Sequence, residues 1–236
     1  MADFGELSRL AARYGYDANH NLRYMALAQL VKSHDIKDIL ILGCGKGILE
    51  YILPEEVRCT SIDIDQRAIE IAREINKEKR NRNFIVADIF RVIDVLRKQF
   101  DGVIVSEVIE HVEDDKRVLD IARQFMKPQD SLFILTVPNL NRFRNKIHTA
   151  FGGKIEFMSD SHIREYNRGD IANLLIAAGF WIIKTDYVYF RFPKECLIRP
   201  FIGLNSLLRK IMLKVFRLWA DYIIVVSVMK QDEGRP

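Results

Sequence analysis

The fold is decided at residues 39–47, which read ILILGCGKG. The four apolar residues at the start are typical of a buried strand, and they lead directly into Gly43, Gly45 and Gly47. Glycines at a strand-to-helix junction permit a tight turn and let a ligand approach the backbone, while the following helix offers unpaired N–H groups. A dinucleotide fingerprint needs its third glycine five positions after the first, where this chain has Ile48, so the loop does not favour a dehydrogenase.

Outward from this loop, apolar runs of strand length alternate with amphipathic stretches of helix length, which is the pattern of βαβ units in a mostly parallel sheet. Helices are predicted at 65–79, with Asp65 as the N-cap, at 115–126, and at 170–178, where Gly179 stops the helix. The predicted fold class is α/β, with a seven-stranded, mostly parallel sheet and helices on both of its faces. The strands are predicted at 38–42, 58–62, 83–87, 101–105, 131–137, 180–189 and 222–229.

The length of 236 residues predicts a single domain over residues 1–236, because α/β folds reach about 250 residues as one unit. Three segments do not follow the alternation of strands and helices: about 1–34, 138–166 and 190–219. We expect them to be cap additions that build substrate recognition.

The composition excludes several classes of protein. With 49% hydrophobic and 29% charged residues the chain is an ordinary globular protein rather than a disordered one. A net charge of +4 is too small for a surface built to neutralise phosphates, so nucleic acid is not the expected partner. The three cysteines form no CxxC pair, and neither a secretory leader nor a membrane-spanning run is apparent, so we expect a cytoplasmic protein.

Two acidic residues add ligand-binding groups to the site that begins at the glycine loop. Asp63 ends the second predicted strand, where a carboxylate can accept hydrogen bonds from both hydroxyls of a ribose. Asp88 follows the third strand and can accept from an exocyclic amine such as adenine N6, with Ile64 and Ile89 on either side of the flat ring. The pattern predicts a site that binds adenosine but has no phosphate-binding motif. The alternative, that these acids only cap helices, suits Asp65 better than the other two.

In this order along the chain, the motifs resemble those of the class I S-adenosylmethionine-dependent methyltransferases. The resemblance covers about residues 35–190 and implies a Rossmann-like sheet with S-adenosylmethionine as the cofactor. The matching stretches are LGCGKG at 42–47, SIDID at 61–65, ADIF at 87–90, SEVIEHVED at 106–114, MKP at 126–128 and LTVPN at 135–139.

The resemblance also implies roles for single residues. The three glycines of the loop would face the methionine part of the cofactor, and Asp63 would bind the ribose. The adenine ring would be bound by Ile64, Asp88 and Ile89. Ser106 is the remaining residue assigned to the cofactor. The chain departs from the family pattern at Ile41, where an acidic residue near the methionine ammonium is usual, and at Gln129 and Asp130, which replace a pair of glycines.

A cluster of carboxylates and histidines follows the fourth predicted strand. Glu107, Glu110 and His111 stand at i, i+3 and i+4, a spacing that gathers them on one face of a helical turn. Methyl transfer needs a nucleophile in line with the sulfonium carbon, and a nearby imidazole can take the proton of an acceptor hydroxyl. We expect His111 to be the general base, Glu110 to orient it, and His162 to join the same cleft from the 138–166 connection.

A divalent metal ion held by the same four side chains is the competing interpretation. The ubiquinone-pathway and small-RNA 2′-O-methyltransferases carry a similar ExxEH cluster. The sequence favours a hydrogen-bonded cleft or a structural histidine over the ion, so no metal ligand is assigned.

The segment 190–219 is both basic and apolar. Between Arg191 and Arg217 seven cations stand against one anion, and apolar residues recur there at helical spacing. We expect a lid packed over the acceptor site, with peripheral contact to an anionic membrane as the second interpretation. Few aromatic residues are placed for base stacking, which disfavours RNA.

These features predict O-methylation of a small or lipid-linked hydroxylated acceptor by S-adenosylmethionine. An RNA 2′-O-methyltransferase with a divalent metal and a non-catalytic subunit that only binds the adenosyl ligand remain the alternatives.

Overall fold

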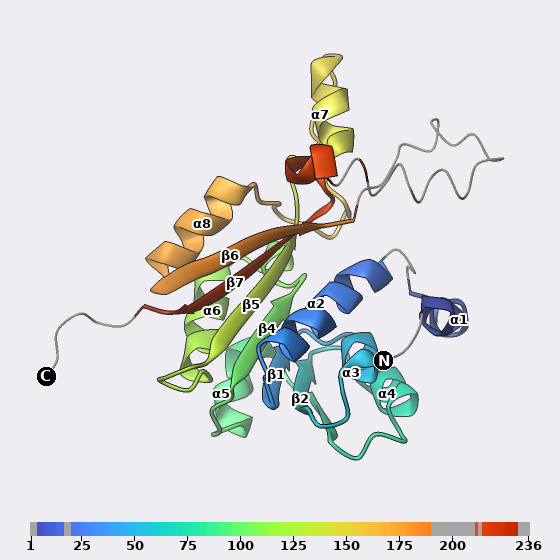
Figure 1. Ribbon diagram of the computed structural model, residues 1–236, viewed down its shortest axis with the longest axis vertical. Coiled ribbons are helices and arrows are strands. Elements are labelled where there is room, and N and C mark those ends of the chain that lie inside the picture. The colour runs from blue at the N-terminus through green and yellow to red at the C-terminus, as the bar shows by residue number, and fades with distance from the viewer. Residues whose placement is uncertain (1–3, 17–19, 190–210, 212–213, 231–236) are drawn as a thin grey trace, which may run out of the picture.

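The computed structural model describes residues 4–16, 20–189, 211 and 214–230 (Figure 1). Its centre is a seven-stranded sheet in the order β3-β2-β1-β4-β5-β7-β6. The first five strands pair in parallel, and β7 runs antiparallel to both of its neighbours. The strands are β1 (Asp38–Leu42), β2 (Arg58–Asp63), β3 (Arg82–Val86), β4 (Gly102–Ser106), β5 (Leu132–Pro138), β6 (Phe180–Val188) and β7 (Tyr222–Met229). The predicted Rossmann-like sheet is confirmed, and the strand limits agree to within one residue.

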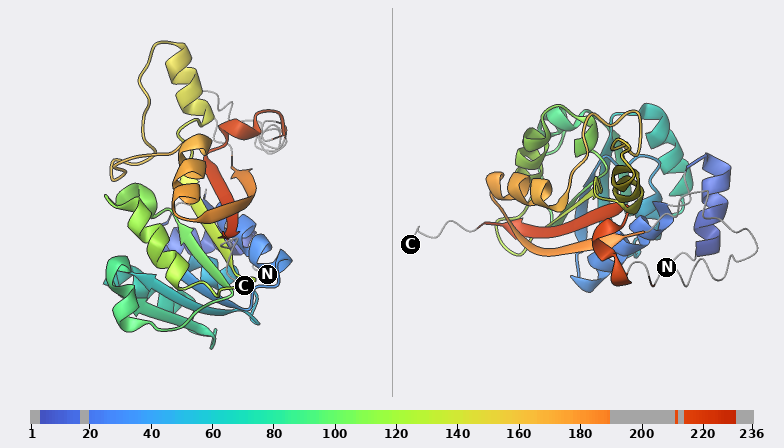
Figure 2. Two further views of the ribbon diagram at one scale, coloured as in Figure 1. Left: turned by 90° about the vertical axis from the view of Figure 1, so that its left-hand side faces the viewer. Right: turned by 90° about the horizontal axis from the view of Figure 1, so that it is seen from above.

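Helices cover both faces of this sheet (Figure 2). The described residues also form three short 3₁₀ turns. They are η2 (Ile89–Arg91) after β3, η3 (Ile109–His111) after β4 and η5 (Arg217–Trp219) before β7. The α-helices among the described residues are α1 (Phe4–Tyr14), α2 (Asn21–Ser33), α3 (Ile48–Ile52), α4 (Gln66–Ile75), α5 (Val92–Val95), α6 (Asp115–Gln124), α7 (Phe143–Ala150) and α8 (Arg168–Ala177).

The side chains of β1 alternate between two hydrophobic cores. Ile39 and Ile41 face a core built with α1, α2 and α3, whereas Leu40 and Leu42 face a core built with α6 and α8. All four side chains are at most 1% exposed, because a parallel strand between two helical layers is buried on both sides. The glycine loop therefore starts from one of the most rigidly packed positions in the chain.

Local hydrogen bonds set the ends of the helices. Asp65 accepts from the backbone N–H groups of Arg67 and Ala68, as predicted for the cap of α4. This helix ends at Ile75, four residues earlier than expected, and the amide of Asn76 then donates to the carbonyl of Gly47. The helix α8 begins two residues earlier than expected, because Asn167 and Asp170 form a capping box.

The strand order reverses between β1 and β4, which lie side by side although β2 and β3 come between them in the sequence. In open α/β sheets, ligands bind at such a switch point, outside the carboxyl ends of the strands. The glycine loop leaves β1 at this point, and the carboxylate and histidine cluster leaves β4 beside it.

The structure describes the three expected cap segments to different extents. Residues 4–14 and 21–33 form α1 and α2, and the connection 138–166 contains α7, which stands out from the body of the molecule (Figures 1 and 2). Most of the predicted lid at 190–219 lies outside the described residues. Within the part of the chain that is described, no helix is long and apolar enough to cross a membrane.

Candidate active site

A cavity of about 570 Å³ opens at the carboxyl ends of β1, β2 and β4. Its volume is in the range of small-molecule and cofactor sites. The lining includes seven of the eight residues that the sequence assigned to the cofactor: Gly43, Gly45, Asp63, Ile64, Asp88, Ile89 and Ser106.

The glycines of the loop serve two different purposes. Gly43 has a φ of +78°, and a side-chain carbon at this position would collide with Val108, so only glycine fits beneath the cavity. Gly47 lies behind the loop, where an added carbon would come within 2.7 Å of the Cβ of Ala72. Gly47, which was expected to face the ligand, is not among the residues that line the cavity. Its role is to let the start of α3 approach α4 closely.

The carboxylate of Asp63 is held at the edge of the cavity by two backbone groups. Its Oδ2 accepts from the N–H of Gly45 at 2.7 Å, and its Oδ1 accepts from the N–H of Asp65 at 3.0 Å. Each oxygen keeps a second lone pair for a ligand hydroxyl. Asp88 also lines the cavity and caps η2 by accepting from the N–H of Phe90.

Glu107 does not share a helical face with Glu110 and His111, contrary to the expectation. Its φ is +56°, in the left-handed region, and its N–H donates to the carbonyl of Thr136 on β5. The 3₁₀ turn starts only at Ile109. Glu107 lines the cavity, and its Oε1 accepts from the hydroxyl of Thr136 at 3.0 Å.

The partner of Glu107 is Arg23 of α2, a residue that the sequence analysis missed. The two side chains form an ion pair of 2.9 Å, and Arg23 is 3% exposed. Its guanidinium lies 5.0 Å from the ring centroids of both Tyr24 and Tyr222. Burial lowers the pKa of Arg23, but the Glu107 carboxylate, Tyr24 and Tyr222 together outweigh burial and raise this pKa above its ordinary value. Burial also raises the pKa of Glu107, against the opposing effect of Arg23.

Arg23 and Glu107 both line the cavity, so a cation and an anion face the same ligand space. The Nε of Arg23 has no hydrogen-bond partner among the described residues. The available sequence signal was an arginine directly before the mostly apolar residues 24–28 (YMALA), since a buried arginine is rare unless it is paired.

The structure brings Glu110, His111 and His162 together from two distant parts of the chain. One ligand atom of each lies within 4.8 Å of the others, and the two imidazole rings meet edge to face with their centroids 4.8 Å apart. Glu110 is fully buried, and neither of its oxygens has a hydrogen-bond partner among the described residues. Burial, and then the Glu107 carboxylate, raise the pKa of Glu110 to about 9.

His111 is oriented by a backbone carbonyl and not, as expected, by Glu110. Its Nδ1 lies 3.1 Å from the carbonyl oxygen of Ser161. Burial lowers the pKa of His111, which keeps the ring neutral at neutral pH. His111 also lines the cofactor cavity, so the cluster and the cavity share a wall.

The segment that carries His162 is fastened by three contacts, one to η3 and two to the start of α6. The N–H of Ile163 donates to the carbonyl of Glu110 at 3.0 Å. Arg164 forms an ion pair of 2.7 Å with Asp115, and the hydroxyl of Tyr166 donates to the same carboxylate. These contacts join the connection after β5 to the turn after β4.

The sequence of the chain matches the family described as Methyltransferase domain over residues 7–185. The chain belongs to this family. The membership confirms the predicted class of protein, an S-adenosylmethionine-dependent methyltransferase. The matched range covers both the cavity and the cluster with its two histidines.

Comparison with individual proteins gives relatives with different acceptors. A ubiquinone biosynthesis O-methyltransferase of Coxiella burnetii is 28% identical over 123 residues, which are 51% of each chain. The chain thus spans about half the length of the curated relatives it matches. Among solved structures, magnesium protoporphyrin IX methyltransferase from Synechocystis, with bound S-adenosylhomocysteine, superposes with a TM-score of 0.63 at 15% identity, covering 90% of this chain and 84% of that one.

The N-methyltransferase NodS from Bradyrhizobium japonicum, also with S-adenosylhomocysteine, gives a TM-score of 0.63 at 16% identity and covers 97% of this chain and 98% of its own. At such identities the methyltransferases share the fold, and the acceptor has to be argued from the site.

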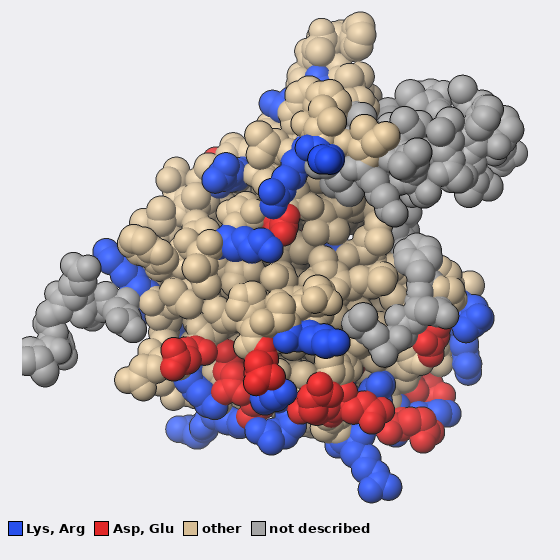
Figure 3. All heavy atoms as spheres, viewed as in Figure 1, with Lys and Arg blue, Asp and Glu red and all other residues tan. Residues whose placement is uncertain are grey.

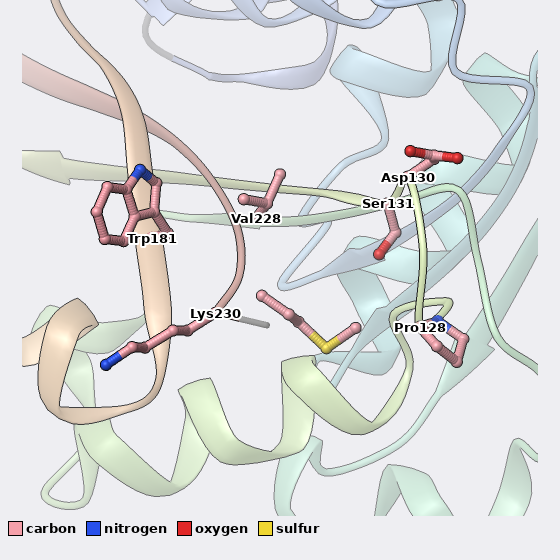
Figure 4. Close-up of a pocket in the computed structure, with 7 residues that line it drawn as sticks. Pro128, Asp130, Ser131, Trp181, Val228 and Lys230 are labelled. Carbon is pink, nitrogen blue, oxygen red and sulfur yellow. The ribbon is translucent and has the colours of Figure 1, made fainter. Parts of the chain in front are cut away.

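A second hollow lies at the opposite end of the sheet, between the residues that precede β5, the start of β6 and the end of β7 (Figure 4). Trp181, Val228 and Lys230 line one side, and Pro128, Asp130 and Ser131 line the other. The lining includes neither a histidine nor a cysteine, so it offers less chemistry than the cavity at the switch point.

Proposed function

We propose that the protein transfers the methyl group of S-adenosylmethionine to a hydroxyl oxygen of a small or lipid-linked acceptor. The observation that carries this proposal is that His111 lies in the wall of the cavity and also belongs to the cluster with the buried Glu110 and the half-buried His162. A group that can accept a proton is thereby held where a cofactor and an acceptor would meet.

The cofactor would use the charges at both ends of the cavity. Asp63 would accept from the ribose hydroxyls, and Asp88 from the adenine amine. At the other end, Glu107 would attract the methionine ammonium, and Arg23 its carboxylate. Glu107 would thus supply the negative charge that Ile41, in the floor of the cavity, does not.

The reaction would form a bond between the acceptor oxygen and the methyl carbon while the bond from that carbon to sulfur breaks. The hydroxyl proton would pass to Nε2 of His111. A carbonyl oxygen only accepts hydrogen bonds, so the contact with Ser161 keeps the ring proton on Nδ1 and leaves the lone pair on Nε2. The lowered pKa of His111 supports a neutral base.

The same cluster fits a divalent cation. A buried carboxyl group without a hydrogen-bond partner, beside two imidazoles, is a donor set that suits a divalent transition metal ion. Glu110, His111 and His162 would hold the ion, which when bound would lower the pKa of an acceptor hydroxyl. Glu107 is not part of this set, since it is paired with Arg23.

A transfer assay tests the proposed activity. The protein is incubated with S-adenosylmethionine labelled in its methyl group and with catechols, polyprenylated phenols or small RNA. Label on a hydroxyl oxygen of the phenols supports the proposal. Transfer to RNA that weakens with salt would replace it with the RNA alternative. Tight cofactor binding without transfer to any acceptor would favour the binding subunit.

We expect Asp63→Ala to weaken S-adenosylmethionine binding by about 1 to 3 kcal/mol, the cost of leaving ligand hydroxyls unpaired in a closed site. Calorimetry measures the change, with Asp94→Ala as the control, because Asp94 is also an exposed acid but lies outside the cavity lining. Binding of NAD should not be detectable in either protein. Equal S-adenosylmethionine affinity in wild type and Asp63→Ala would remove the ribose role.

The surface near the site supports an acceptor that reaches it from a membrane. The connection around α7 exposes Phe151 (86%), Ile155 and Phe157, and Leu218 of η5 is exposed as well. On the face in Figure 3, most Asp and Glu side chains gather over the lower half, away from the α7 end. We therefore propose that the α7 end contacts anionic lipid. The former expectation for 190–219 rests largely on residues outside the described part of the chain.

Phe151→Asp is expected to reduce flotation with vesicles that contain anionic lipid at least tenfold, because an aromatic side chain gains about 1.5 to 3 kcal/mol from burial. Lys154→Glu should reduce it further, by about 1 kcal/mol per charge removed. Val95→Asp, an exposed apolar residue of α5, is the matched control. Flotation that is absent in wild type, or unchanged by both substitutions, would contradict the membrane contact and favour a water-soluble acceptor.

A further inference from the structure

The carboxylate of Glu165 lies behind the cluster and takes no part in the proposed chemistry. Its side chain is fully buried, and it accepts hydrogen bonds from three groups: the guanidinium of Arg142, the backbone N–H of Met158 and Nδ1 of His162. The contact with His162 is 2.9 Å long. A buried carboxylate with all its partners in place is a fixed group.

Arg142 is what holds this carboxylate in place. Its side chain is 5% exposed, and besides Glu165 it donates to the carbonyls of Asn139 and Glu156. The amide of Asn139 in turn donates to the carbonyl of Ala220 at 2.7 Å, immediately before β7. The Arg142–Glu165 pair is therefore tied to the end of β5 and to the chain entering β7.

The partners of the two histidines determine which ring nitrogen carries the proton. A carboxylate oxygen and a carbonyl oxygen only accept hydrogen bonds, so Nδ1 of His162 must donate to Glu165, as Nδ1 of His111 donates to Ser161. Both rings are thus held in the same tautomer. Each keeps its lone pair on Nε2, the only ring nitrogen left to take up a proton or a cation.

We propose that Glu165, supported by Arg142, is a positioning residue that keeps the ring proton of His162 on Nδ1 and so presents Nε2 to the site shared with His111 and Glu110. The inference rests on the proposed function for the role of His162 in the reaction. The tautomer itself can be measured without any assay of activity. Partners of this kind behind a functional histidine are worth about 10- to 100-fold in activity or metal affinity.

Two variants test the inference. Glu165→Gln keeps the shape of the side chain but replaces an acceptor-only group with an amide. The double substitution Arg142→Met with Glu165→Met removes both buried charges together, which protein cores tolerate better than the loss of one partner. Glu156→Gln is the control, because this exposed residue of the same connection pairs with Arg144 and does not contact His162.

Nitrogen NMR of the imidazoles reads the tautomer directly. The chain has five histidines, and the signals of His162 are assigned by their loss in His162→Gln. In wild type and in Glu156→Gln we expect one protonated Nδ1 and one unprotonated Nε2. In both Glu165 variants the ring proton should be shared between the two nitrogens of His162. The rate of methyl transfer should then fall about 10- to 100-fold. The affinity for S-adenosylmethionine should stay within about twofold of wild type.

Manganese alone provides a second readout that needs no acceptor. If the cluster binds the ion in wild type, the Glu165 variants should bind it about 10- to 100-fold more weakly. A fixed Nδ1 proton in both Glu165 variants would overturn the inference. A redistributed proton with unchanged methyl transfer would support the positioning by Glu165 and overturn the proposed role of His162 in the reaction.

Discussion

His111→Ala is expected to lower the rate of methyl transfer by about 10²- to 10⁴-fold, the usual contribution of a positioned general base. The affinity for S-adenosylmethionine should remain nearly unchanged, because the loss falls on the transition state. Single-turnover transfer of the labelled methyl group measures the rate, and calorimetry measures the affinity. His148→Ala is the matched control, since this histidine lies on α7 and pairs with Glu156 outside the cluster.

The pH dependence of methyl transfer should report the protonation of His111. A base must be unprotonated to act, so transfer falls as the pH drops through the pKa of His111. Because burial lowers that pKa, the fall should begin below about 6.5, the ordinary histidine value. Unchanged transfer in His111→Ala at every pH would remove this residue from the reaction.

Chelation separates the two roles that His111 could have. Full activity after rigorous metal removal would assign it as the base alone. Loss of activity that manganese restores would assign the cluster to an ion. In that case ion binding must release the proton of Glu110, whose pKa is about 9 in the metal-free protein, so affinity for the ion should rise with pH up to that value.

Arg23→Met is the second substitution with a large expected effect, because it leaves the buried Glu107 without its partner. Breaking a buried ion pair costs about 3 to 5 kcal/mol in the free energy of unfolding. Denaturant unfolding measures this cost. S-adenosylmethionine binding should weaken by about 2 to 5 kcal/mol, because a fully desolvated charge pair with the ligand carboxylate is lost.

The double variant Arg23→Met with Glu107→Gln distinguishes the two effects. It removes both charges, so most of the stability should return while the cofactor affinity stays low. If affinity returned together with stability, Arg23 would be a structural residue only.

The stability of the single variant Arg23→Met should also depend on pH. Burial raises the pKa of Glu107 in the wild type, and we expect a further rise once the guanidinium is gone. A carboxyl group whose pKa is raised by folding stabilises the protein fully only below its unfolded pKa, about 4.3, and that stability is lost as the pH rises through the folded value. The deficit relative to wild type should therefore shrink as the pH is lowered.

The elements that could be predicted from the sequence are those that neighbouring residues determine. The strand limits followed from short apolar runs, and Asp65 was recognisable as a cap because its partners are two and three positions away. The positions of Asp63 and Asp88 could be predicted because each follows a strand whose end is visible in the sequence.

The features that could not be predicted depend on partners far away in the chain. The left-handed backbone of Glu107, which broke the expected helical face, is accompanied by a hydrogen bond to Thr136 on the neighbouring strand. Arg23 acquires its role only when α2 brings it beside Glu107, its charged partner in the turn after β4. No periodicity encodes such contacts, which arise between segments that only the finished sheet brings together.

The three contacts that fasten residues 163–166 to η3 and to the start of α6 bear on how such a chain can diversify. Because Ile163, Arg164 and Tyr166 lie on the C-terminal side of His162, the anchor does not include α7. The stretch 146–155, which lies between Asn145 and Glu156, can then change its length or its side chains while the support of His162 stays in place. A lineage could exchange one acceptor for another by rebuilding this stretch and inherit the reacting groups unaltered.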